Sequence, residues 1–177
     1  ARLEDVSSFA KYLGGSSANI AFGTARLGLK SAMLSRVGDD HMGRFLVESL
    51  QREGCDTSAI KVDPERLTAM VLLGIKDRET FPLVFYRENC ADMALVEEDI
   101  DEAFIASSKS LLITGTHFSP PGVFTASRTA LASAAKHHVK RTPDIASRPA
   151  PSRLPRPAPA ATPLPPRPDV SAPVRSL

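Results

Sequence analysis

The sequence contains few cysteines and carries little net charge. Cys55 and Cys90 are the only two thiols among 177 residues, and they form no Cys-x-x-Cys pair. We therefore expect neither a disulfide scaffold nor a cysteine-rich zinc site, and a reducing cytoplasm is the natural setting. The formal net charge of +2 is too small to indicate a nucleic acid or an anionic membrane as a partner.

Long apolar runs are also missing. No apolar stretch approaches the roughly 18 residues that a membrane-spanning helix needs, so we expect a soluble protein. The four histidines have no metal-ligand spacing, and we expect no metal site. A hydrophobic fraction of 42% over 177 residues is nevertheless enough for one domain with a real core.

The chain divides into two regions of different composition, predicted as residues 1–138 and 139–177. Residues 143–177 hold 11 of the 15 prolines and no aromatic side chain. Because proline lacks an amide donor, a helix or a central strand is excluded there, and we predict a disordered tail with polyproline II character. The Arg-, Pro- and Ala-rich composition from about residue 139 also suggests a frameshift product as a hypothesis.

The first region alternates helical and strand patterns. The predicted helices span 16–27, 41–53, 97–107 and 124–136, and the predicted strands span 31–37, 67–76, 81–87 and 110–115. Ser16 or Ser17 is expected to cap the first helix, with Gly28 in a left-handed conformation at its end. Strands 67–76 and 81–87 form an antiparallel hairpin, whereas 110–115 is typical of a buried parallel strand. This order predicts an α/β doubly wound sheet with a small β-hairpin flap.

The predicted sheet is incomplete. The helix that ends near Lys136 should be followed within a few residues by the next parallel strand. The residues after His138 do not have the composition of such a strand. We therefore expect the regular pattern to stop at His138.

Gly14, Gly15 and Asn19 form the motif with the clearest chemistry. Paired glycines before a helix allow the backbone to approach a ligand closely, and the helix start offers unpaired N–H donors. Asn19 in the first turn presents both a donor and an acceptor, which suits a polyol better than a phosphate chain. A capped helix after a tight turn, without any ligand, is the alternative interpretation.

The run from Gly14 to Gly43 resembles the N-terminal signature of PfkB-type (ribokinase-like) carbohydrate kinases. It has the Gly-Gly pair, an Asn four residues after the second Gly, and the Gly38-Asp39-Asp40 turn. Further segments resemble the branch of this family that phosphorylates a six-carbon keto-deoxy sugar acid in inositol breakdown; they span 9–15, 24–29, 85–95, 102–105 and 114–119. The resemblance covers about residues 3–136.

The resemblance implies that Gly14, Gly15 and Asn19 hold sugar hydroxyls. It also implies that Tyr86 and Arg87, at the end of a flap strand, face an acidic sugar, whose carboxylate a guanidinium can grip with two parallel bonds. A solvated strand-end cation is the alternative for Arg87.

Other implications concern the sheet edge, the cofactors and the partners. Thr116 and His117 follow the apolar strand, where α/β sheets bind ligands, although a loop histidine with a structural partner is the alternative. The family implies ATP and Mg as cofactors, a sugar acid as the small-molecule partner, and a homodimer through the β flap.

One family element has no counterpart in the sequence. Related kinases share a late Gly-Ala-Gly-Asp element whose amides and carboxylate serve phosphoryl transfer, and no such element and no Walker loop occur here. We therefore expect a truncated, inactive sugar kinase whose catalytic and ATP-binding residues are not in this chain. A non-catalytic remnant, or an interaction protein that uses the flap or the Pro-rich tail, remains the alternative.

Overall fold

The computed structural model describes residues 2–75, 77, 80–114 and 121–143. The helices are α1 (Ser16–Arg26), α2 (His41–Arg52), α3 (Glu102–Ala106) and α4 (Pro121–Lys136), with short 3-10 helices η1 (Leu3–Asp5), η2 (Ala91–Ala94) and η3 (Glu97–Asp99). The strands are β1 (Ser35–Gly38), β2 (Ile60–Asp63), β3 (Met70–Leu73), β4 (Leu83–Tyr86), β5 (Ser110–Ile113) and β6 (Lys140–Pro143). Within these described ranges no helix has the length and apolar character that crossing a bilayer requires.

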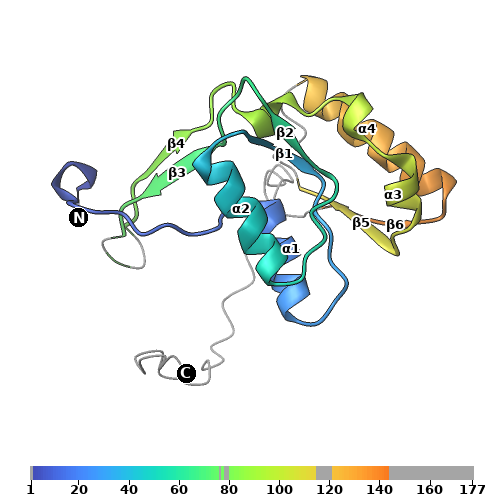
Figure 1. Ribbon diagram of the computed structural model, residues 1–177, viewed down its shortest axis with the longest axis horizontal. Coiled ribbons are helices and arrows are strands. Elements are labelled where there is room, and N and C mark those ends of the chain that lie inside the picture. Colours follow the sequence, from blue (N-terminus) through green and yellow to red (C-terminus); the bar gives the residue numbers. More distant parts are fainter. Residues whose placement is uncertain (1, 76, 78–79, 115–120, 144–177) are drawn as a thin grey trace, which may run out of the picture.

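The strands pair in twos. β1 pairs with β2 and β5 pairs with β6, both in parallel, whereas β3 and β4 form an antiparallel hairpin. Each parallel pair is connected through a helix, α2 for the first and α4 for the second. Figure 1 shows the hairpin extending away from the rest of the fold, with α3 and α4 beside β5 and β6. The arrangement confirms the predicted α/β layer with a β flap.

Strand β6 corrects the predicted end of the regular pattern. The sequence analysis placed this end at His138, but Lys140–Pro143 lies in register with Ser110–Ile113. A four-residue strand pairs through its backbone, so the basic side chains of Lys140 and Arg141 can remain exposed without breaking the ladder. The objection that no parallel strand follows α4 was therefore wrong. The remainder of the predicted tail, 144–177, lies outside the described residues.

Several helix boundaries also differ from the prediction. Gly15, with φ 91°, is the residue before α1, and neither serine caps the helix as predicted. The predicted helix 97–107 is two elements, η3 and α3, because Asp101 caps a new helix by accepting from the amides of Ala103 (2.8 Å) and Phe104 (3.2 Å). Strand β2 was not predicted.

Three small apolar clusters hold these elements together. The first joins α1 to α2, the second joins α3 and α4 to β5, and the third packs the start of α4 against the segment before η3. Their buried members are Ala21, Met33, Leu50 and Cys55; Ile105, Ala130, Ala134 and Val139; and Leu95, Val123 and Ala126. The first cluster positions the helices that carry the candidate site.

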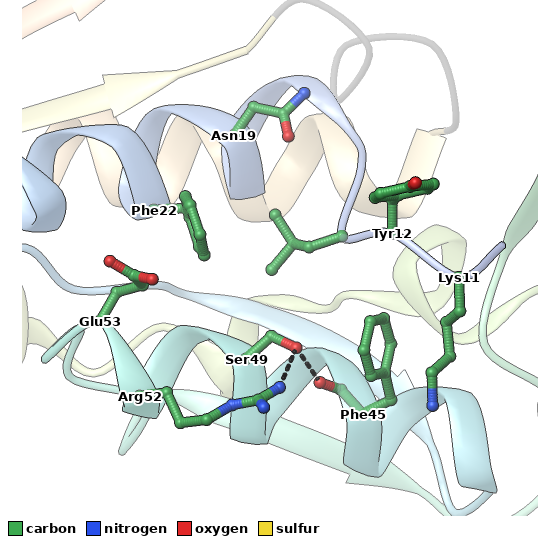
Figure 2. Close-up of a pocket in the computed structure, with 9 residues that line it drawn as sticks. Lys11, Tyr12, Asn19, Phe22, Phe45, Ser49, Arg52 and Glu53 are labelled. Atoms are coloured by element: carbon green, nitrogen blue, oxygen red, sulfur yellow. Dashed lines mark hydrogen bonds between the residues drawn. The ribbon is translucent and has the colours of Figure 1, made fainter. Parts of the chain in front are cut away.

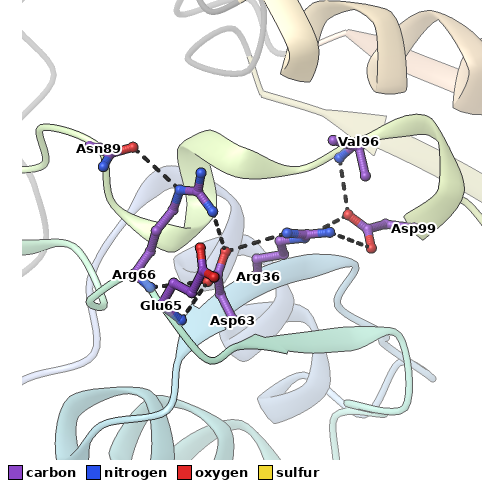
Figure 3. Close-up of polar contacts among 7 residues, drawn as sticks. All are labelled: Arg36, Asp63, Glu65, Arg66, Asn89, Val96 and Asp99. Atoms are coloured by element: carbon purple, nitrogen blue, oxygen red, sulfur yellow. Dashed lines mark hydrogen bonds and ion pairs between the residues drawn. The ribbon is translucent and has the colours of Figure 1, made fainter.

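A charged network connects β1 to η3 (Figure 3). Arg36 on β1 donates from Nε to Asp99 Oδ2 (2.7 Å) and from Nη2 to Asp99 Oδ1 (3.0 Å), which is a bidentate pair. The third guanidinium nitrogen, Nη1, lies 3.4 Å from Oδ2 of Asp63 at the end of β2. Both carboxylates are buried, with Asp63 3% exposed and Asp99 8% exposed. The network therefore ties the β1–β2 unit to the unit that contains α4.

Hydrogen bonds lower the pKa of both carboxylates. Burial alone would raise the pKa of Asp99, but the bonds from Arg36 and from the Val96 amide outweigh burial and lower it. The pKa of Asp63 is lowered chiefly by the hydrogen bond from the Glu65 amide. Because both groups are held ionised in the fold, the native state is stabilised at neutral pH.

This network predicts acid sensitivity. A carboxylate whose folded pKa is depressed stabilises the protein above its unfolded pKa of about 3.9, and this contribution is lost as pH falls through the lower folded pKa. We expect Asp99→Asn to lower the free energy of unfolding at pH 7 by about 3 kcal/mol, because Arg36 loses its bidentate partner. The variant should also show a flatter decline in stability between about pH 5 and pH 3 than the unsubstituted chain. Urea unfolding across this pH range measures both effects.

The matched control is Asp39→Asn, whose carboxylate forms an exposed pair with Arg44. Such a pair contributes at most about 1 kcal/mol. If Asp99→Asn cost no more than Asp39→Asn and kept the original pH dependence, the network would not join the two units.

Candidate functional site

The glycine pair opens the candidate site. Gly15 has a positive φ of 91°, a conformation that side chains other than glycine rarely adopt. A Cβ added at Gly14 or Gly15 would meet no atom of the described residues within 4 Å, so the described part of the chain does not pack against this turn. The Asn19 amide nitrogen of the main chain donates to the Gly15 carbonyl (2.9 Å), which starts α1. The backbone of this turn is therefore accessible to a ligand.

Asn19 lies one turn into α1 and is exposed. Its side-chain amide forms no hydrogen bond with any other described residue, so both its donor and its acceptor are available. The structure thus does not turn Asn19 into the core, which is what a purely structural role would require. This arrangement suits a ligand that offers several hydroxyl groups.

Asn19 lines a cavity of about 420 Å³ between α1 and α2 (Figure 2). Its other lining residues come from the segment before the glycine pair and from both helices; they are Lys11, Tyr12, Leu13, Phe22, Phe45, Ser49, Arg52 and Glu53. A volume in the range of about 300–1,000 Å³ suits a small molecule. Aromatic rings form part of the wall, and charged and polar side chains form much of the rest.

The charged side chains around this cavity differ in the partners that they contact. At the helix ends, Arg26 and Glu53 form a bidentate pair of 3.0 and 2.8 Å, which raises the pKa of Arg26 and lowers that of Glu53. Arg52 donates to the Glu48 carbonyl (3.3 Å) and to Ser49 Oγ (3.1 Å). The Lys11 ammonium lies 4.2 Å from the centroid of the Phe45 ring, which is a cation–π contact.

The end of the flap is arranged differently from what the sequence suggested. Tyr86 is 53% exposed at the end of β4. Arg87 donates from Nε (2.7 Å) to Asp92 Oδ2, and its Nη2 lies 2.6 Å from the same oxygen. Neither Tyr86 nor Arg87 lines the cavity that contains Asn19. The structure therefore places Asn19 at the cavity, whereas Gly14 and Gly15 lie in the turn before α1 and are not among the lining residues. The two flap residues do not line this cavity either.

The Gly38-Asp39-Asp40 turn has a structural role. Asp40 caps α2 by accepting from the Gly43 amide (2.7 Å), and its other oxygen accepts from the Thr68 amide (2.7 Å). Burial raises the pKa of Asp40, but these bonds outweigh burial and lower it. Added Cβ atoms at Gly38 and Gly43 would collide with the Arg66 and Gly38 carbonyl oxygens, respectively. The spaced glycines of the signature therefore allow close packing here.

Thr116 and His117, which the sequence placed at the edge of the sheet, lie outside the described residues. Across the ranges that the structure describes, no three His, Cys, Asp or Glu side chains gather in a way that could hold a metal ion. The sequence analysis missed Lys11 and Tyr12 as cavity residues. Their position directly before the glycine pair was the available signal, because a turn brings the segment before it toward the helix after it.

Comparison with known proteins relates this chain to a family. Residues 1–169 match the pfkB family carbohydrate kinase, which extends beyond the predicted limit of residue 136. The 5-dehydro-2-deoxygluconokinase of Geobacillus kaustophilus is 45% identical over 115 residues, covering 64% of this chain and 34% of that protein. The enzyme of the same name from Geobacillus thermodenitrificans is 40% identical over 148 residues, covering 83% of this chain and 44% of that protein. The chain thus spans less than half the length of these curated relatives.

Solved structures show the same fold. A PfkB protein from Polaromonas sp. JS666 is 30% identical with a TM-score of 0.76, covering 82% of this chain and 50% of that one. An uncharacterized sugar kinase from Pyrococcus horikoshii, solved in complex with ATP, is 27% identical with a TM-score of 0.74, covering 82% of this chain and 47% of that one. These matches confirm the predicted resemblance and the ribokinase-like fold. The chain belongs to the pfkB family of carbohydrate kinases.

Proposed function

We propose that this chain supplies the sugar-binding part of an ATP-dependent kinase that phosphorylates a sugar acid in inositol catabolism, as 5-dehydro-2-deoxygluconokinase does. The observation that carries the proposal is the exposed Asn19 amide, which lines the cavity directly after an accessible glycine turn. In this proposal Gly14, Gly15 and Asn19 contact sugar hydroxyls. A reducing cytoplasm remains the proposed setting, with Cys55 and Cys90 as free thiols.

ATP and Mg belong to the proposal only through the family. Within the described residues no cluster of acidic side chains fits a metal ion. The sequence also contains no Gly-Ala-Gly-Asp element to hold a transferring phosphate. The described residues therefore supply no candidate site for the metal ion, and the nucleotide enters the proposal through the family alone.

The role of Asn19 can be tested by binding. We expect Asn19→Leu to weaken the affinity of the chain for D-glucitol, a neutral polyol, by about tenfold, because two hydrogen bonds of about 0.5–1.5 kcal/mol each are lost. Calorimetric titration measures this affinity. Gln51→Leu is the matched control, since Gln51 is an exposed amide that does not line the cavity. Equal affinities of the two variants would remove Asn19 from the site.

Activity of the chain alone is a second test. We propose that these 177 residues do not turn over ATP by themselves, because phosphoryl transfer needs positioned amide donors and a base. A coupled assay of ADP formation, with ATP, Mg²⁺ and a sugar acid, should show no rate above that without the sugar. A complete 5-dehydro-2-deoxygluconokinase serves as the positive control. Sugar-dependent turnover by the purified chain would refute this part of the proposal.

The flap supports a second proposal, that two copies of the chain associate through it. Apolar side chains on both strands are exposed; they include Met70 (42%), Val71 (44%), Leu73 (44%), Leu83 (45%) and Phe85 (64%). An isolated two-stranded hairpin is marginally stable and has open edges. A second copy of the flap would cover both the apolar faces and the edges.

Sedimentation velocity can test this association. We expect Phe85→Ser to shift the chain toward the monomer, because the exposed ring of Phe85 would lie in the interface. Leu27→Ser is the control, since Leu27 is 81% exposed at the end of α1, away from the flap. A concentration-independent monomer in the unsubstituted chain would exclude dimerisation through the flap.

A further inference from the structure

Two cations line the Asn19 cavity, Lys11 and Arg52, and the guanidinium of Arg52 already donates to the Glu48 carbonyl and to Ser49 Oγ. The two cations proposed for the sugar-acid carboxylate, Arg87 and Lys11, differ in whether a carboxylate neutralises them. Arg87, which the sequence favoured as the group that grips a sugar-acid carboxylate, lies 2.6 Å from Asp92 through Nη2 and also donates to it from Nε. Because the charge of Arg87 is compensated in this way, a ligand carboxylate would have to compete with Asp92. Arg87 also lies outside the group of residues that line the Asn19 cavity.

Lys11 is in the opposite situation. Within the described residues no hydrogen bond and no ion pair connects Lys11 to a carboxylate. Its ammonium group contacts the face of the Phe45 ring at 4.2 Å from the centroid. A ring face attracts a cation but does not neutralise its charge, and it leaves ammonium donors available.

Lys11 and Asn19 line the same cavity from different sides of the glycine turn. Figure 2 shows Lys11 extending from the segment before the turn toward α2, whereas Asn19 comes from α1. The two groups differ in chemistry, since a neutral amide suits hydroxyl groups and an ammonium suits an anion. Together they match a ligand that has hydroxyls at one part and a negative charge at another.

We propose that Lys11 holds the carboxylate of the sugar acid and thereby selects acidic over neutral sugars. This inference rests on the proposed sugar-binding function, whose hydroxyl contacts it assigns to Asn19 and the glycine turn. The Phe45 ring positions the ammonium group against the cavity wall. Arg87 is left with a structural role in the ion pair with Asp92.

The test compares two ligands that differ in one group. D-gluconate and D-glucitol have the same carbon number and similar hydroxyl patterns, but only D-gluconate carries a carboxylate. We expect the full chain to bind D-gluconate more tightly, and Lys11→Met to reduce the affinity for D-gluconate by about tenfold, because a charge-assisted hydrogen bond is lost. The affinity for D-glucitol should change by less than about twofold. Calorimetric titration gives both values.

Two further variants make the result specific. Lys30→Met removes an exposed lysine outside the cavity and should leave the preference for D-gluconate unchanged. Lys11→Arg retains the charge and should retain most of the preference. The preference of the unsubstituted chain should also decline as salt is raised from 0.01 to 1 M, since the Debye length falls from about 30 to about 3 Å.

The outcomes separate this inference from the proposed function. If the chain binds both polyols and Lys11→Met keeps the preference for D-gluconate, the role of Lys11 is wrong and sugar binding stands. If Arg87→Met lost the preference for D-gluconate and Lys11→Met kept it, the proposed role of Lys11 would also be wrong. If the chain binds neither polyol, the sugar-binding function and the inference both fail.

Discussion

The candidate site depends on the backbone conformation of Gly15. Gly15, with φ 91° and ψ 145°, separates the irregular segment that carries Lys11 and Tyr12 from the helix that carries Asn19. A residue with a Cβ would be strained in this conformation. The single turn therefore sets the relative positions of both sides of the cavity. Leu13 and Phe22, which line the cavity, also pack against the apolar cluster that includes Ala21 on α1 and Leu50 on α2.

Ion pairing connects distant parts of the fold, and it decides which cations are already neutralised. Arg36 is compensated by two buried aspartates, and Arg87 by Asp92. These pairs connect elements that are distant in sequence, such as β1 and η3, and they leave those guanidinium groups less available to a ligand. Lys11 differs because an aromatic ring is its contact. Arg52 also lines the cavity, but its guanidinium donates to the Glu48 carbonyl and to Ser49 Oγ. In a family of carbohydrate kinases, an ammonium group that has no carboxylate partner among the described residues and lines the same cavity as an exposed amide is suited to an acidic group.

Local sequence signals were sufficient for a large part of the fold. Asp40 next to an amphipathic run predicted the start of α2, and Gly28, with φ 85°, adopts the left-handed conformation expected after α1. The apolar strands on either side of a polar turn predicted the β3–β4 hairpin. The turn at the glycine pair and the position of Asn19 in the first turn of α1 could be predicted because both depend on residues close together in the chain. In each case the deciding interaction is between near neighbours.

Tertiary structure decided the features that depend on distant residues. β6 was missed because a strand of Lys, Arg, Thr and Pro is specified by backbone pairing with β5, not by its own hydrophobic pattern. The sequence alone determined that Asn19 follows a glycine turn at a helix start and that Arg87 and Lys11 are cations. Only the fold placed Asp92 against Arg87 and the Phe45 ring against Lys11. These contacts matter because the energy of a charge depends on the groups that surround it in space.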